Sequence, residues 1–176
     1  SRGLGDVYKR QDIFILSSGH ASLAMYVCLE KYHEINAEEL FIKHGGHPHR
    51  DEENKIYCST GSLGLGLTIA LGRAVANPKR KVWVLISDGE AAEGSIWESL
   101  KTIVEESINN IEVFVNINGL CAYKEVDQDY ISARLKAFLP TINLRYTTVE
   151  QYPFLKGLNA HYHVMNEDNY NQVLES

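Results

Sequence analysis

The chain has 176 residues, of which 44% are hydrophobic and 23% are charged, a composition typical of a globular domain. Its net charge of −6 excludes the cationic footprint of a nucleic-acid-binding protein. No apolar run approaches the roughly 20 residues that span a membrane, so we expect no membrane segment. The cysteines are widely spaced and never form a CxxC pattern, which excludes a disulfide scaffold or a cysteine metal cluster. We expect them to be small buried residues of a cytoplasmic protein: Cys28, Cys58 and Cys121.

We interpret both ends of the sequence as different from those of a complete native domain. Residues 1–11 show neither a helical nor a strand period and do not lead into the following pattern, so we interpret them as a non-native extension. A native tail is the alternative. Residues 170–176 end inside a predicted helix. Because no linker rich in Pro, Gly or Ser divides the chain, we expect residues 12–176 to form one incomplete domain.

The first part of the chain predicts two helices and a loop. Apolar residues at helical spacing indicate a helix over residues 19–32. Asn36, followed by two glutamates within one turn, is typical of the N-cap of a short helix. Residues 44–58 are rich in Gly, Pro and charge, which favours a loop whose acidic cluster, residues 51–53, faces solvent.

The next segment, residues 59–76, combines Ala and Leu with several glycines. Ser59 or Thr60 could cap a helix beginning here, and Asn77-Pro78 would end it. Each glycine costs roughly 1 kcal/mol relative to alanine in a helix interior. Their number therefore indicates either very close packing or the close approach of a ligand: Gly61, Gly64, Gly66 and Gly72.

A strand–helix–strand unit follows. Residues 81–87 form a continuous apolar run, typical of a parallel strand buried on both faces, and residues 111–117 predict a second strand. Residues 94–108 between them predict an amphipathic helix. Such a βαβ unit indicates an α/β fold with a mostly parallel sheet flanked by helices. The apolar side of the helix is expected to contain Ile96, Leu100, Ile103 and Val104. Further elements are expected at 126–137 (helix), 146–149 and 162–165 (strands) and 167–175 (helix).

Two polar residues follow directly after the strands predicted at 81–87 and 111–117, Asp88 after the first and Asn118 after the second. Ligands of open parallel sheets bind outside the carboxyl ends of the strands, so both side chains could project into one crevice. A carboxylate with an amide oxygen suits Mg²⁺, which completes its shell with water and phosphate oxygens. The alternative is structural: Asp88 would cap the following helix, and Asn118 would form a turn before Gly119.

Asp88-Gly89 followed by Asn118 resembles the motif of thiamine diphosphate enzymes, and four blocks around it resemble transketolases in particular. These blocks, in the order of the family, are LSSGHA (16–21), GGHPH (45–49), STGSLGLG (59–66) and SDGEAAEGSIWES (87–99). The resemblance implies a thiamine diphosphate-binding fold that uses thiamine diphosphate and Mg²⁺. The sequence departs from the family at Ser87, which replaces a glycine, and at Leu65 and His49. Because of these departures, the resemblance does not determine which sugar accepts the two-carbon unit.

The resemblance also implies roles for individual residues. The metal ligands would be the side chains of Asp88 and Asn118 and the backbone carbonyl of Leu120. The cofactor would be contacted by His20, Gly61, Ser62, Leu63, Gly89 and Asn118. The catalytic residues would be His20, His47 and Glu93, the last at a subunit interface near the pyrimidine ring. Histidine suits proton exchange with a substrate alcohol because its pKa lies near neutrality.

Alternatives remain for several of these side chains. His20 could simply cap its helix, and His44, His47 and His49 share one loop without the further ligand that a metal cluster needs. His161 and His163 alternate in a predicted strand and are expected to be structural. Trp97 and Leu100 are expected in the core, although Ile96 and Trp97 could also form an apolar surface facing a partner.

Transketolase-like enzymes need two halves, and this chain resembles only the half that binds the diphosphate. The pyrimidine-binding half would lie on a separate subunit or on a missing C-terminal domain, so we expect a homo- or hetero-oligomer. The implied reaction transfers a two-carbon ketol unit between sugar phosphates. Two alternatives are another thiamine diphosphate enzyme, of the deoxyxylulose-phosphate synthase or 2-oxoacid dehydrogenase type, and a non-catalytic binding module of the same fold.

Overall fold

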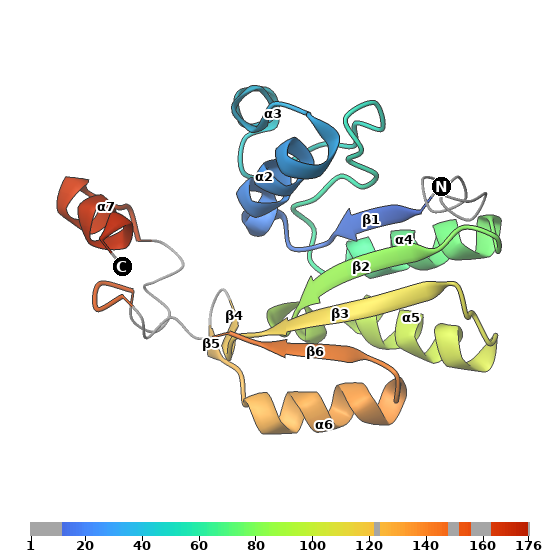
Figure 1. Cartoon of the computed structure of the whole chain (residues 1–176). Coiled ribbons are helices and arrows are strands. Elements are labelled where there is room, and N and C mark those ends of the chain that lie inside the picture. Colours follow the sequence, from blue (N-terminus) through green and yellow to red (C-terminus); the bar gives the residue numbers. More distant parts are fainter. Residues whose placement is uncertain (1–11, 122–123, 148–151, 156–162, 176) are drawn as a thin grey trace, which may run out of the picture.

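The computed structural model describes residues 12–121, 124–147, 152–155 and 163–175 (Figure 1). The interpretation of residues 1–11, the role of His161 and parts of the strands expected at 146–149 and 162–165 lie outside these residues.

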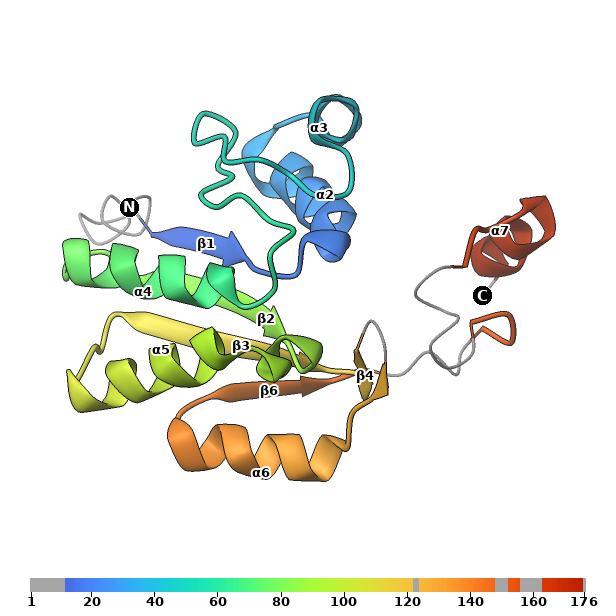
Figure 2. The ribbon, with the colours of Figure 1, turned by 180° about the vertical axis from the view of Figure 1, so that it is seen from behind.

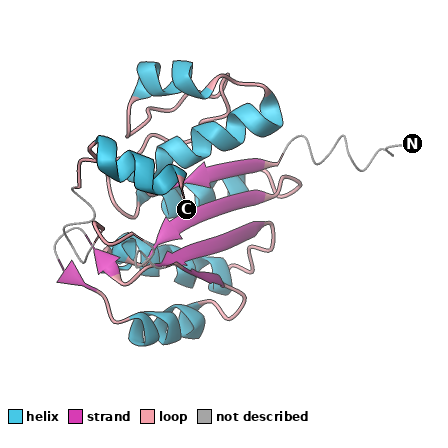
Figure 3. Ribbon diagram, turned by 60° about the vertical axis from the view of Figure 1, so that its left-hand side comes forward, coloured by secondary structure: helices cyan, strands magenta, loops and turns pink. Residues whose placement is uncertain are grey.

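The centre of the fold is a parallel sheet of four strands in the order β1-β2-β3-β6. Its strands, β1 (Ile13–Leu16), β2 (Val82–Ser87), β3 (Ile111–Ile117) and β6 (Asn143–Tyr146), run side by side in one direction (Figure 3). Because every pairing is parallel, the carboxyl ends of all four strands meet at one edge. The α/β class and the βαβ unit are confirmed.

Helices lie between these strands in the chain and after the last of them. They are η1 (Gly19–Ala21), α2 (Ser22–His33), α3 (Ala37–His44), α4 (Leu65–Ala76), η2 (Gly89–Ala92), α5 (Gly94–Glu105), α6 (Gln128–Phe138) and α7 (Glu167–Leu174). A small antiparallel pair, β4 (Leu120–Cys121) and β5 (Lys124–Glu125), follows β3. As predicted, the Asn36 side chain caps α3 by accepting the amide of Glu39 at 2.9 Å. None of the helices among the described residues has the length and apolar character needed to cross a membrane.

The main core lies on one face of the sheet, beneath α4 and α5, which Figure 2 shows in front of the strands. Leu67 and Ala70 of α4 and Leu100 of α5 are fully buried against it. The other face is covered less completely. Trp83 stacks on Phe114 with ring centroids 6.0 Å apart, and Phe14 is 42% exposed. The expectation that residues 81–87 are buried on both faces therefore holds for only one face within the described residues.

The helix predicted from residue 59 begins only at Leu65, so that prediction was wrong at its start. Gly61 and Gly64 adopt positive φ angles of 105° and 79°, which interrupt a right-handed helix. Ser59 and Thr60 do not cap α4, whose N-cap is Gly64. Instead, the Ser59 hydroxyl accepts the Arg50 amide at 2.8 Å, and the Thr60 amide donates to the Pro48 carbonyl at 2.9 Å. The segment thus becomes a turn that anchors the 45–50 loop.

The glycine pattern has more than one cause. A Cβ at Gly66 would collide with the Ser17 side chain, so this glycine permits close packing of α4 on the end of β1. Gly72 has open space where its Cβ would be, and neither packing nor a ligand explains it.

Two burial predictions were also wrong. Val104 is 46% exposed, whereas the other apolar residues predicted on that side of α5 are buried, because Val104 lies at the edge of the stripe formed by Ile96, Leu100 and Ile103. Cys28 is exposed on α2, whereas Cys58 and Cys121 are buried and free, as expected.

Candidate functional site

Asp88 lies at the carboxyl end of β2 and is only 1% exposed. One carboxylate oxygen accepts the amide of Gly89 at 3.0 Å. The other accepts the amides of Asn118 at 3.1 Å and Gly119 at 2.7 Å, just beyond β3. The carboxylate therefore joins the ends of two neighbouring strands, which is the convergence expected from the parallel topology.

Burial raises the pKa of the Asp88 carboxyl above its ordinary value, and the backbone N–H groups that donate to it oppose this shift. A buried carboxylate whose charge is balanced only by amide dipoles favours a nearby cation.

Asn118 begins a tight turn. Its amide oxygen accepts the Leu120 amide at 2.8 Å, and Gly119 has a φ of 75°. The structural alternative raised from the sequence is therefore realised: Asp88 caps η2, and Asn118 forms a turn. Asp88 Oδ1 and Asn118 Oδ1 each accept one hydrogen bond, so each keeps a second lone pair that could bind a metal ion, whereas Asp88 Oδ2 already accepts two amides.

Gly89 allows this turn to approach β2. A Cβ on Gly89 would lie 3.2 Å from the Leu120 carbonyl oxygen and 3.3 Å from the Cys121 Cα. The three oxygen donors expected for Mg²⁺, on Asp88, Asn118 and Leu120, thus come from one edge of the sheet. The described residues hold no cluster of three or more His, Cys, Asp or Glu side chains that could bind a metal ion. An ion here would be held by the Asp88 carboxylate together with an amide and a carbonyl oxygen, and this oxygen set fits Mg²⁺.

His47 lies against the segment that precedes α4. A Cβ on Gly19 would be 2.7 Å from the His47 ring and 2.6 Å from the Thr60 hydroxyl, and a Cβ on Gly61 would be 3.9 Å from the same ring. His47 is exposed, as is His20, the residue after Gly19. The structure therefore brings His47 beside both Gly19-His20 and the turn that starts at Gly61.

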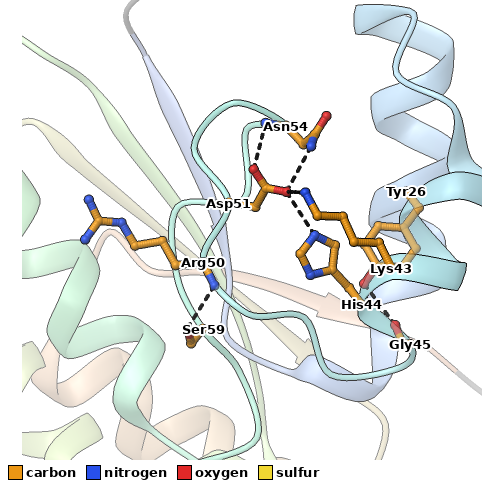
Figure 4. A network of polar contacts seen from close by, with 8 residues as sticks. All are labelled: Tyr26, Lys43, His44, Gly45, Arg50, Asp51, Asn54 and Ser59. Atoms are coloured by element: carbon orange, nitrogen blue, oxygen red, sulfur yellow. Dashed lines mark hydrogen bonds and ion pairs between the residues drawn. The ribbon is translucent and has the colours of Figure 1, made fainter.

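The loop carrying His47 is anchored by Asp51, as Figure 4 shows. The Asp51 carboxylate accepts the Lys43 ammonium at 2.6 Å, the His44 ring nitrogen at 3.0 Å and the Asn54 side-chain amide at 2.9 Å. These contacts lower the pKa of the Asp51 carboxyl far below its ordinary value, with the Lys43 hydrogen bond as the largest cause. Its side chain is only 10% exposed.

One expectation about this loop needs correction. Asp51 is a structural anchor rather than a solvated charge, because its partners converge on it from α3 and from its own turn. Glu52 also pairs, with Arg50 and Arg73. His44 belongs to the Asp51 network rather than to a group of loop histidines, while His49 is exposed.

We predict that Asp51→Asn lowers the free energy of unfolding by about 1–3 kcal/mol at neutral pH, because charge-assisted hydrogen bonds are lost. Because its pKa is depressed in the folded state, the carboxyl stabilises the fold fully above about pH 4 and loses this effect as pH falls toward the folded-state pKa. The stability advantage of the wild type should therefore shrink from pH 4 downward in denaturant titrations. Glu53→Gln, in the same loop, controls for net charge; a gap of constant size would contradict this assignment.

Glu93 lies at the start of α5, exposed and beside the turn of Gly64. A Cβ on Gly64 would meet the Glu93 Cβ at 2.9 Å and the Ser95 hydroxyl at 2.6 Å. Glu93 thus adjoins the turn that contains the expected cofactor contacts Ser62 and Leu63. Exposed apolar side chains occur here, since Leu63 and Leu65 are each 44% exposed.

The expected apolar surface of Ile96 and Trp97 is not present. Ile96 is completely buried in the core of this chain. Trp97 is half-buried, donates its ring N–H to the Ala91 carbonyl at 3.0 Å and packs on Phe138 with ring centroids 5.0 Å apart. The Arg134 guanidinium lies 4.2 Å from the Trp97 ring. Trp97 therefore joins α5 to α6.

Sequence reasoning missed Glu90, which is 2% exposed and interacts with residues far away in the chain. No local pattern indicates this burial, although its place in the block with Asp88 could have drawn attention to it. His163 is structural, as expected: its ring nitrogen lies 2.8 Å from the Asn169 side chain, and it packs on Phe154. No strand is found at residues 163–165.

Comparison with known proteins supplies the family. Residues 43–136, slightly more than half of the chain, match the family described as thiamine pyrophosphate enzyme, C-terminal TPP binding domain. The chain therefore belongs to this family of thiamine diphosphate enzymes, as the four motifs predicted.

Several curated relatives are transketolases. The chain is 35% identical over 120 residues to an apulose-4-phosphate transketolase subunit of Actinobacillus succinogenes, a match covering 62% of this chain and 44% of that protein. The corresponding subunit of Phocaeicola vulgatus is 34% identical over 121 residues, covering 63% and 43%. Human transketolase is 31% identical over 120 residues, covering 62% and 19%. These matches span less than half the length of each relative.

Proposed function

We propose that this chain is the diphosphate- and magnesium-binding half of a transketolase-like enzyme that transfers a two-carbon ketol unit between sugar phosphates. The observation that carries the proposal is the buried Asp88 carboxylate, which holds the turn of Asn118 at the carboxyl edge of a parallel sheet. The family match and the transketolase relatives support the same reaction class.

In this proposal Asp88, Asn118 and the Leu120 carbonyl hold Mg²⁺. The exposed turn of residues 61–63 contacts the diphosphate through its backbone. The positive φ angles of Gly61 and Gly64 keep this turn from joining the helix that follows. Gly89 allows the Leu120 carbonyl to lie close to the end of β2, because a side chain at Gly89 would push the Leu120 turn away. When bound, thiamine diphosphate supplies the carbon nucleophile that accepts and delivers the two-carbon unit.

The histidines act on the substrate side. His47, exposed and supported by Gly19 and Thr60, binds a sugar hydroxyl and exchanges its proton. His20, on the neighbouring segment, contacts both cofactor and substrate. The Asp51 network holds the His47 loop in place, because Asp51 bonds to His44, which precedes the loop, and to Asn54, which follows it.

A second half completes the site. Two relatives are named as single subunits of a transketolase, which supports a separate pyrimidine-binding partner for this chain. Glu93, Leu63 and Leu65 are exposed around the expected cofactor turn and would face that partner. The proposed localisation is the cytoplasm, where sugar phosphates are exchanged.

The test is a ketol-transfer assay on the purified chain, with and without a pyrimidine-type transketolase half. We expect no transfer by the chain alone and transfer on addition of the partner, together with a larger mass in solution. Because the chain provides only the diphosphate side, turnover by the monomer alone would contradict the half-enzyme proposal. No transfer in any combination, with thiamine diphosphate bound, would favour a non-catalytic module.

A further inference from the structure

Glu90 is a buried carboxylate that the proposed mechanism does not use. Its Oε1 accepts the Ser17 hydroxyl at 2.5 Å and the Gly64 amide at 3.0 Å. Its Oε2 accepts the Ser87 amide at 2.9 Å, and the Ser87 hydroxyl lies 3.4 Å away. With 2% of its surface exposed, the residue has little contact with solvent.

The three partners of Glu90 come from three separate segments. Ser17 follows β1 and leads to Gly19-His20; Gly64 ends the turn that includes residues 61–63; Ser87 ends β2 directly before Asp88. One side chain therefore connects the segments that carry His20, residues 61–63 and Asp88.

We infer that Glu90 is a positioning residue, which fixes the turn of residues 61–64 against the end of β2 and so sets the geometry of the diphosphate site. This inference rests on the proposed function and deepens it. Glu90 itself would touch neither cofactor nor substrate, since its two oxygens are turned to the protein interior and each is already bonded to a backbone amide.

The pattern of donors explains why a carboxylate is needed. An ionised carboxylate only accepts hydrogen bonds, whereas a glutamine amide has one accepting oxygen and one donating NH₂ group. Each Glu90 oxygen faces a backbone N–H, that of Gly64 or that of Ser87. In either orientation a glutamine would therefore place its NH₂ group against a backbone donor, and a hydroxyl rotation cannot repair that contact.

Ser87 is part of the same arrangement. It stands where the family resemblance has glycine, and its amide and hydroxyl both point to one Glu90 oxygen. Glycine at this position would keep the amide contact and lose only the longer one. Ser87→Gly is therefore a mild variant of the same contact, to be compared with Glu90→Gln.

The experiment combines amide hydrogen exchange with binding of thiamine diphosphate and Mg²⁺, measured by calorimetry on the wild type, Glu90→Gln and Ser87→Gly. Leu135→Ala, a fully buried substitution on α6, is the control for general loss of stability. In Glu90→Gln we expect faster exchange of the Gly64 amide and about tenfold weaker binding, the effect of one unsatisfied buried group. Ser87→Gly should stay within about twofold of the wild type.

The two readouts separate the possible failures. Normal Gly64 exchange or normal binding in Glu90→Gln would overturn the positioning role, as would equally weak binding in Leu135→Ala. Absence of binding by the wild type would overturn the proposed function instead, while the Gly64 exchange still tests the contact. If Glu90→Gln does not fold, Ser17→Ala removes a single donor from the same carboxylate and should weaken binding in the same direction.

Discussion

Replacing Asp88 with alanine should strongly weaken the magnesium-dependent binding of thiamine diphosphate. The carboxylate is the acidic metal ligand proposed at the carboxyl end of β2. Its loss would weaken Mg²⁺ binding and so leave the negative charge of the diphosphate less well balanced. We expect binding in the presence of Mg²⁺ to weaken by about a hundredfold, or roughly 2.7 kcal/mol. Calorimetric titration with Mg²⁺ and with a chelator measures this effect.

The same substitution also removes the acceptor of three backbone amides, so it will lower stability. Asp127→Ala is the matched control, because Asp127 also caps a helix, accepting the Tyr130 amide at 2.9 Å. Asp127→Ala should lose about 1 kcal/mol of stability and retain binding. If Asp88→Ala behaves in the same way, Asp88 is a structural cap and the metal assignment is wrong.

Replacing His47 with alanine should have the second largest effect, on turnover rather than on binding. The ring lies beside Gly19 and Gly61 and is exposed, and the proposed function assigns it to the substrate. General acid–base groups contribute about a hundredfold or more to rate, so we expect turnover with the partner half to fall by at least about that factor. Binding of thiamine diphosphate should change by less than about threefold.

The control for this prediction is His33→Ala at the end of α2, which removes another imidazole. Transfer kinetics and cofactor titrations are both needed. Parallel losses of cofactor affinity and turnover in His47→Ala would assign the ring to the cofactor anchor instead. An unchanged turnover would remove His47 from the catalytic group.

Local patterns were sufficient to predict the centre of the fold. The apolar runs of β2 and β3, the helix between them and the Asn36 cap all depend on neighbours within a few residues. The placement of Asp88 beside Asn118 followed from parallel topology alone, because both strands end at the same edge.

The errors arise where distant contacts decide the structure. Ser59 and Thr60 are residue types that cap helices, yet both bond to the loop beyond His47, and Gly61 takes a positive φ. Glu90 was missed for the same reason, since its shortest contact is with Ser17, just beyond another strand.

The central claim is that the carboxyl edge of β2 and β3 binds the diphosphate with Mg²⁺, and a crystal structure of the chain with both ligands tests it most directly. The account predicts the metal ion in contact with Asp88, Asn118 and the Leu120 carbonyl, and the diphosphate against residues 61–63. A diphosphate bound elsewhere on the chain, with the Asp88 carboxylate contacting only the amides of Gly89, Asn118 and Gly119, would contradict it.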